Sequence, residues 1–227
     1  IGSSLPGATT GGTIDNLSSL VNNGTINFNQ AGAGTYSLTS NITGSGSVAV
    51  NASGTTLFLG NNTYTGGTTV SAGTLQIGAG GVTGSIRGNI VNNSSVVFSR
   101  TDAVSYAGSM SGSGTLGKTS TGTLLLLGAS TATGDIYVSR GALELTGAAA
   151  RLGSAASDMI IGLQGDALLT VCNAAQLVSH DAEIGTTNGG TAIVTGADSK
   201  WTANFLYVGN TAAGELRLLD GAKLSTV

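Results

Sequence analysis

The chain is poor in several residue types that other protein classes depend on. Among its 227 residues there is one cysteine and one proline, aromatic residues make up 4% and charged residues 8%. A lone cysteine, Cys172, cannot form an internal disulfide, so the fold must be stabilised by packing. The net charge of −3 argues against a nucleic-acid-binding surface. The longest aliphatic run, residues 124–127, is far too short to cross a membrane.

Glycine is what the chain has in place of these residues. Its 38 glycines separate short runs that are rich in Thr, Val, Ile and Leu, such as residues 68–70 and 74–77. Such runs between glycines are strand and turn signals, and no stretch keeps an apolar period of 3.6 residues. With 40% hydrophobic residues the chain can bury a core. The sequence therefore predicts a folded, all-β protein.

Two long stretches of the chain, residues 20–77 and 90–145, repeat each other. Residues 20–23 (LVNN) recur as residues 90–93 (IVNN), and Phe28 matches Phe98, all at an offset of 70. At an offset of 68 the matches are Val48 with Leu116, Leu57 with Leu125, Leu59 with Leu127, Gly66 with Gly134, Val70 with Val138, Gly73 with Gly141, Leu75 with Leu143 and Ile77 with Leu145. A duplication of this kind predicts a repeating architecture.

A shorter period is visible in the last third of the chain. Ile161-Gly162, Ile184-Gly185 and Val208-Gly209 recur at spacings of 23 and 24 residues. Four further columns keep step with them: Met159, Ala182 and Leu206; Leu169, Ala192 and Leu216; Val171, Val194 and Leu218; Leu177, Trp201 and Leu224. We expect each long unit to hold three such turns, and the whole chain to hold roughly ten.

A period in the twenties fits one coil of a β-helix better than a propeller blade of about 40 residues. We predict a right-handed parallel β-helix that forms a single fragment over residues 1–227. Residues 18–78 and 88–147 are its duplicated long units, and residues 159–227 form three coils. Columns such as Ile161, Ile184 and Val208 should face inward, while Thr, Asn, Ser and Gln face outward. We also expect both ends to be cuts in a longer rod.

Few residues suggest chemistry. His180 beside Asp181 invites a catalytic interpretation, but no Gly-x-Ser-x-Gly elbow supplies a nucleophile. Asp158 and Asp181 stack one coil apart and would be the best candidates for the paired carboxylates of a polysaccharide-cleaving β-helix. Asp166, Asp198 and Asp220 fall in other columns. We expect no catalytic residue, no cofactor and no metal site, and the sequence identifies no ligand-binding residue.

Other motifs have structural explanations. Residues 112–117 match a dinucleotide-binding pattern, but residues 44–49 repeat them in the other long unit, which indicates a turn. Trp201 shares a column with leucines and is expected in the core, not as a sugar platform. Tyr36 and Tyr106 occupy matching positions in the two units. Cys172 is expected to be a passive outward side chain in the column of Thr195 and Leu219.

Residues 61–78, NNTYTGGTTVSAGTLQIG, closely resemble the autotransporter-associated β-strand repeat of Gram-negative passenger domains. Residues 129–145, ASTATGDIYVSRGALEL, resemble a degraded copy that lacks the Tyr and the second Gly of the pair. Residues 195–201 (TGADSKW) and 206–209 (LYVG) resemble a second repeat type of large autotransporter adhesins. The resemblance implies a β-helical passenger at the cell surface (outer membrane, extracellular side) or secreted, held by its own C-terminal β-barrel, which is not in this chain.

The expected function follows from this resemblance and from the long polar faces. The chain would be an autotransporter passenger that acts as an adhesin or self-association (aggregation or biofilm) module. Its expected partners are a host matrix protein, a glycan or another copy of itself, and no nucleic acid. The alternative is a structural stalk that displays, or helps to translocate, an effector or enzyme domain upstream. An ice-binding β-helix would need a strictly regular Thr-x-Thr face, which the uneven outward columns do not offer.

Overall fold

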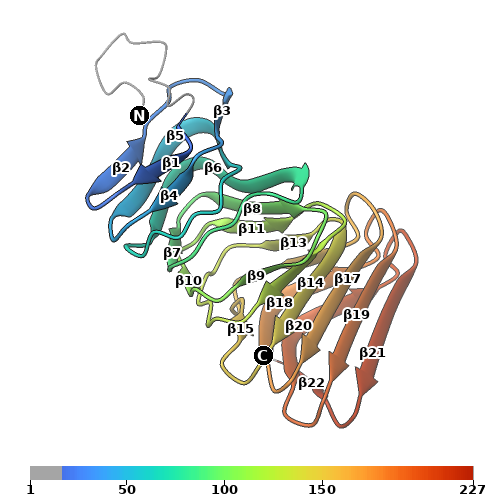
Figure 1. The fold of residues 1–227 in the computed structure, drawn as a ribbon. Coiled ribbons are helices and arrows are strands. Elements are labelled where there is room, and N and C mark those ends of the chain that lie inside the picture. The colour runs from blue at the N-terminus through green and yellow to red at the C-terminus, as the bar shows by residue number, and fades with distance from the viewer. Residues whose placement is uncertain (1–16, 227) are drawn as a thin grey trace.

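The computed structural model describes residues 17–226, and the first 16 residues and the last residue of the expected single unit lie outside this range. Within it every strand pairing is parallel and the strands coil into a β-solenoid of about 9 turns (Figure 1). This confirms the predicted parallel β-helix and comes close to the expected ten coils. The described range contains no helix long and apolar enough to span a membrane.

Each coil passes through three walls. Wall 1 contains the strands β2(Thr25–Phe28), β7(Ile90–Asn92), β10(Met110–Ser111), β15(Arg151–Leu152) and β22(Lys223–Ser225). Wall 2 contains β3(Thr35–Leu38), β8(Ser95–Arg100), β11(Thr115–Lys118), β13(Ile136–Val138) and β16(Met159–Ile161). Four long strands run through walls 1 and 2 without a break: β5(Ser47–Phe58), β6(Thr68–Gly81), β18(Gln176–Ile184) and β20(Lys200–Val208).

Wall 3 is a separate sheet. It contains β9(Val104–Tyr106), β12(Thr123–Leu126), β14(Gly141–Thr146), β17(Ala167–Cys172), β19(Gly190–Thr195) and β21(Gly214–Leu219). The pair β1(Ser19–Val21) and β4(Asn41–Thr43) takes the same place in the first coils, between wall 2 and wall 1.

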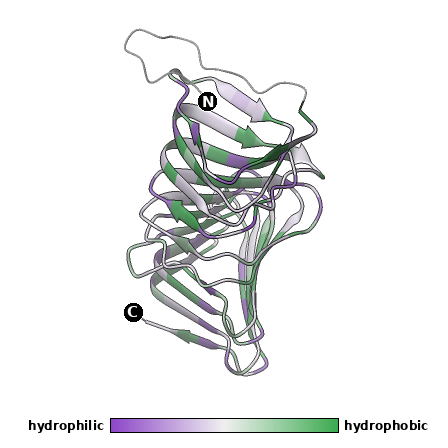
Figure 2. Ribbon diagram, turned by 60° about the vertical axis from the view of Figure 1, so that its left-hand side comes forward, coloured by the Kyte–Doolittle hydropathy of each residue, from purple (hydrophilic) through white to green (hydrophobic). Residues whose placement is uncertain are grey.

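The strands alternate between buried and partly exposed residues because successive side chains point to opposite faces. In β17, for example, Ala167, Leu169 and Val171 are buried while Leu168, Thr170 and Cys172 are partly exposed. Figure 2 shows this alternation of hydropathy along the strands of many coils. One face of each strand therefore contributes to a continuous core.

Glycine permits the tight turn that both long units share. Gly44 and Gly112 have φ values of 100° and 101°, a region that favours glycine. A Cβ atom at Gly112 would lie 2.1 Å from the carbonyl oxygen of Asn92, and one at Gly44 would lie 2.3 Å from that of Asn22. A strand follows each turn, so residues 112–117 form a repeated turn, as predicted, and not a dinucleotide-binding loop.

The strand register confirms the five columns of the last third. Ile161 pairs with Ile184 and Ile184 with Val208, and the other four columns pair as expected. Ile161 and Ile184 are fully buried, but Val208 is 47% exposed because no described coil packs on the last one. The column assignment is confirmed, but the expectation that Val208 is buried is wrong.

The expectation that each long unit holds three turns is wrong. Three turns after Ile26 the register reaches Ile90, through Val48 and Thr68. The sequence match of Ile26 at an offset of 70 is Val96, which lies on wall 2. The matches at an offset of 68 advance in the same way, since Leu75 on wall 2 corresponds to Leu143 on wall 3. The long unit is therefore three turns plus one wall.

One member of a core column is a lysine, which the sequence did not reveal. Lys118 pairs with Phe98 in one neighbouring coil and with Val138 in the other, and it is only 2% exposed. Its ammonium group donates hydrogen bonds to the carbonyl oxygens of Ser120 and Arg140. Desolvation by burial lowers the pKa of Lys118 to about 8.

Candidate functional site: the aspartate column and the outer faces

A polar column runs along the outside of the rod where wall 2 begins. In the early coils it consists of hydroxyl residues that pair across successive strands: Thr35, Thr55, Thr74, Ser95 and Thr115. From the next coil it consists of Asp135, Asp158 and Asp181, which precede the paired residues Ile136, Met159 and Ala182. Asp181 pairs in turn with Phe205, where the polar column stops, as the sequence spacing predicted.

The first two aspartates of this column each accept a hydrogen bond from the backbone of the following one. The Asp158 N–H donates to Asp135 Oδ1 at 3.1 Å, and the Asp181 N–H donates to Asp158 Oδ1 at 3.2 Å. The series breaks at Asp181, whose Oδ1 is shielded from solvent and accepts no well-formed hydrogen bond within residues 17–226, although His180 Nδ1 lies 3.4 Å from it. Buried polar atoms normally have a partner, so this oxygen calls for an explanation.

His180 lies between two of these carboxylates. Its Nδ1 atom is 3.2 Å from Asp158 Oδ1 and 3.4 Å from Asp181 Oδ1. The backbone N–H of His180 donates to the carbonyl oxygen of Ser157, which fixes this corner to the preceding coil. Half of the His180 side chain is exposed, so solutes can reach the cluster.

The sequence analysis found part of this cluster and missed part. Asp158 and Asp181 stack as expected, and Asp135, which the sequence analysis did not consider, precedes Asp158 in the same column. The spacing from Asp135 to Asp158 is the same 23 residues, which was the available signal. Asp166, Asp198 and Asp220 lie outside the column, as expected; Asp220 accepts a hydrogen bond from the Thr195 hydroxyl at 2.7 Å.

The aromatic residues are mostly core residues. Trp201 is fully buried and its indole N–H donates to Ser179 Oγ at 3.1 Å, so it cannot act as a sugar platform. Phe28 and Phe98 are also buried, and each packs against the tyrosine that follows it in the coil, Tyr36 and Tyr106 respectively. The repeated aromatic pairs thus stabilise both long units from inside.

Cys172 lies on the outer side of wall 3, half-buried. Its Sγ atom is 3.3 Å from Thr146 Oγ1 and 3.6 Å from Glu144 Oε1. Burial raises the pKa of the Cys172 thiol, and the neighbouring carboxylate acts in the same direction. The environment therefore favours the unreactive thiol form.

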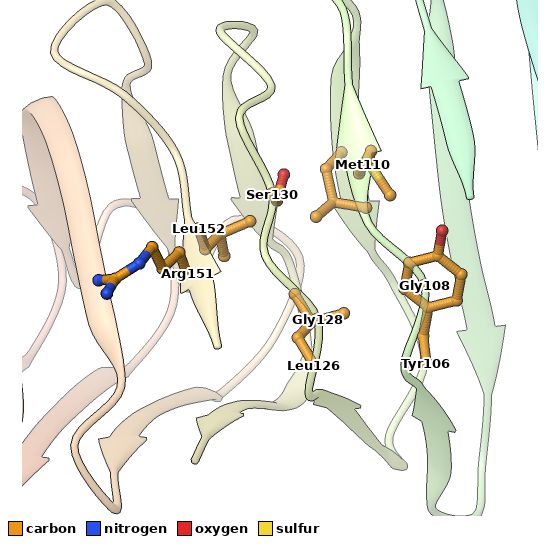
Figure 3. A pocket seen from close by; sticks show the side chains of 9 residues that line it. Tyr106, Gly108, Met110, Leu126, Gly128, Ser130, Arg151 and Leu152 are labelled. Atoms are coloured by element: carbon orange, nitrogen blue, oxygen red, sulfur yellow. The ribbon is translucent and has the colours of Figure 1, made fainter. Parts of the chain in front are cut away.

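Two hollows differ in what they can hold. An enclosed one of about 10 Å³ lies among side chains that include Tyr106, Met110, Leu126 and Leu152, from which Arg151 points away (Figure 3). This volume holds a water molecule at most. An open one of about 410 Å³ lies on the outer face of wall 3, lined by residues that include Asp166, Thr191, Glu215 and Arg217. Contact with a large partner is possible at the outer face and not in the enclosed hollow.

Comparisons with known proteins agree with the repeats seen in the sequence. The family model described as passenger-associated-transport-repeat matches residues 53–77 and 116–145. These stretches end at Ile77 and Leu145, which the self-comparison of the sequence also pairs. The family model does not extend to the last third, so its resemblance to a second adhesin repeat stays a prediction. No solved structure matches the chain significantly.

A curated relative is similar over part of the chain. The chain is 64% identical over 55 residues to a protein named Adhesin BmaC autotransporter, from Brucella suis biovar 1 (strain 1330). The match covers 24% of this chain and 2% of the relative, so the chain spans only a small fraction of that protein's length. The family match, this relative and the parallel solenoid lead to one conclusion: the chain carries passenger-associated-transport repeats over residues 53–77 and 116–145 and is similar, over part of its length, to an autotransporter adhesin.

Proposed function

We propose that this chain is an autotransporter passenger that acts as an adhesin on the surface of a Gram-negative bacterium, or in a form secreted from it, and that it is not an enzyme. The observation that carries the proposal is the similarity to a protein named an adhesin, together with a parallel solenoid whose outer faces are long and polar. Candidate partners are a host matrix protein, a glycan or a second copy of the chain. Nucleic acid is not among them, because the net charge is negative.

The geometry of the outer faces supports many weak contacts in place of one strong site. The hydroxyl column of wall 2 repeats on every early coil. Wall 3 presents Thr170 on one coil and Thr191 and Thr195 on the next, on either side of the outward Ile193 that pairs with Thr170. Neighbouring coils lie about 4.8 Å apart, so a partner along the rod can hydrogen-bond to several coils at once. Each such bond contributes about 1 kcal/mol, which makes adhesion depend on several side chains together.

The test is to display the chain on a non-adherent bacterium and to measure aggregation and binding to host matrix proteins and glycans. We expect the parent to bind or to aggregate. We expect one of two triple variants to reduce this at least tenfold: Thr170→Ala/Thr191→Ala/Thr195→Ala on wall 3, or Thr55→Ala/Thr74→Ala/Thr115→Ala on wall 2. A single substitution from either set should have a small effect. The two triple variants also identify which wall faces the partner. A displayed chain that neither binds nor aggregates would contradict the adhesin proposal.

A second candidate function is a stalk that displays or helps to translocate an upstream effector or enzyme domain. The observation in its favour is the core, whose inward columns run from coil to coil through the described residues and make a stiff spacer. Deleting the coils from the full-length protein while retaining its other regions should then impair display of the upstream domain. Normal display after the deletion would contradict the stalk.

A further inference from the structure

We propose that Asp158, His180 and Asp181 form a binding site for a divalent metal ion, Zn²⁺ being the best fit. Within residues 17–226 these three residues form a group whose potential ligand atoms all lie within 4.8 Å of one another. They come from two successive coils at the corner between wall 1 and wall 2. An ion here would join the two coils outside the core.

The spacing of the ligand atoms fits a zinc ion. Bonds from Zn²⁺ to His nitrogen and carboxylate oxygen are about 2.0–2.2 Å long, which places tetrahedral ligands about 3.3–3.6 Å apart. His180 Nδ1 lies 3.2 Å from Asp158 Oδ1 and 3.4 Å from Asp181 Oδ1, close to this separation. The ligand atoms of the two carboxylates lie within 4.8 Å of each other, so a carboxylate that stands wider than about 3.6 Å would turn toward the ion on binding. A water molecule would complete the four ligands, since the site faces solvent.

The hydrogen bonding of the aspartate column also points to a ligand. Asp135 and Asp158 each accept a backbone N–H from the next coil, so their positions are explained without an ion. Asp181 Oδ1 is shielded from solvent and accepts no well-formed hydrogen bond among the described residues; its polar contact is with His180 Nδ1 at 3.4 Å, and a ligand atom of the Asp158 carboxylate lies within 4.8 Å of the Asp181 carboxylate. A cation between the two carboxylates would satisfy this oxygen and remove the repulsion between them.

The ligand set also selects among cations. Imidazole nitrogen suits Zn²⁺ and other transition metals, whereas Ca²⁺ and Mg²⁺ prefer ligand sets made of oxygen alone. One His and two Asp side chains match the composition that Zn²⁺ accepts. The inference concerns a different feature from the hydroxyl faces of the proposed adhesin, so either can be true without the other.

The experiment is calorimetric titration of Zn²⁺ into the metal-free full chain, carried out in a Cys172→Ser background to exclude thiol binding. We expect one ion per chain and a rise in the thermal unfolding midpoint when the ion is present. Asp181→Asn and His180→Gln, which keep the size of each side chain, should each weaken binding at least tenfold. Asp166→Asn removes an exposed carboxylate elsewhere on the rod and should bind as the parent does.

Circular dichroism of each variant shows whether the fold is retained, and all three substituted side chains are at least partly exposed. Absence of saturable binding in the parent would overturn the site. Equal affinity in the parent and in both Asp181→Asn and His180→Gln would also overturn it, because the ion would then bind elsewhere. Adhesion of displayed cells is not needed for either outcome.

Discussion

The early and late coils of the rod solve the same packing problem with different periods. In the early coils, paired residues on wall 2 are 19 to 21 apart, as Thr55 with Thr74 and Leu75 with Val96 show. In the late coils they are 23 or 24 apart, as Met159 with Ala182 and Ala182 with Leu206 show. The period changes after Ile136, one coil later than the outward column changes from the hydroxyl of Thr115 to the carboxylate of Asp135.

The late coils gain their length partly in a repeated turn between wall 3 and wall 1. The turn is closed by a backbone hydrogen bond between residues three apart, and the bonds join Ala150 to Gly147, Ala175 to Cys172, Ser199 to Gly196 and Ala222 to Leu219. A constant turn gives a constant period. The comparison shows that the coil period of a solenoid can be detected in its sequence when the turns between its walls have a constant length, more than when its strands do.

The largest expected effect on stability tests whether the early and the late coils exclude water from their cores equally. Val50→Asn in an early coil and Val194→Asn in a late coil each place an amide in a fully buried position and should destabilise the protein by about 2–4 kcal/mol. Thr195→Asn, one residue later on the outer side, should change stability by less than about 1 kcal/mol. Denaturant melts measure all three. Equal losses for Val194→Asn and Thr195→Asn would contradict the assignment of inward and outward faces.

The next effect tests whether the two long units share one turn. Gly44→Ala and Gly112→Ala place a Cβ atom against a backbone oxygen at positive φ, and each should destabilise by at least about 2 kcal/mol. Gly24→Ala is the control, because a Cβ atom there meets nothing within 4 Å. Thermal or denaturant unfolding should rank the two turn variants together and the control near the parent. A tolerated Gly112→Ala would show that the copies differ at this turn.

A smaller effect comes from Lys118, at the end of the early coils. Its pKa is lowered to about 8 in the folded protein, so the unfolded chain binds the proton more tightly and stability rises with pH above about 8. Between pH 8 and pH 9.5 the gain should be about 1.5 kcal/mol. Burial raises the pKa values of Tyr64 and Tyr106, so the tyrosines reverse this trend above about pH 10.

The matched variant for this measurement is Lys118→Met, which keeps the length of the side chain without its charge. Its stability should stay nearly constant from pH 8 to pH 9.5 in the same denaturant melts. If the parent and Lys118→Met show the same pH dependence, another group is responsible.

The smallest effect concerns the thiol of the late coils. Cys172→Ser keeps the size and the hydrogen-bonding capacity of a half-buried outward side chain, and should change stability by less than about 1 kcal/mol. Reaction of the parent with a thiol reagent should be slow, because burial raises the thiol pKa. A rapid reaction, or loss of adhesion in the variant, would assign Cys172 a role that its contacts do not indicate.

The sequence predicted the late coils better than the early ones for a physical reason. Constant spacing placed Leu177 with Trp201 and Val171 with Val194 correctly. In the early coils the spacing drifts between 19 and 22 residues, as Thr55 with Thr74 and Ile26 with Val48 show, so no single offset aligns them. The duplication was visible there, but the number of turns it spans was not.

At the candidate site, too, residue spacing predicted some features and not others. The stacking of Asp158 and Asp181 followed from spacing alone. The position of the His180 ring between two carboxylates depends on how the chain bends at the corner, which spacing does not encode. Lys118 could not be placed in the core from its type, because lysine is almost never fully buried.

The mismatch between repeat and coil has a consequence for how such a rod meets its surroundings. Because the long unit is three turns plus one wall long, each residue of the second copy lies one wall further around the axis than the matching residue of the first copy. A third copy would be shifted by one further wall, and a fourth would return to the starting position. Tandem duplication of this unit therefore places copies of one motif on different walls of the rod. A longer rod would present the motif on more of its sides as well as over a greater length.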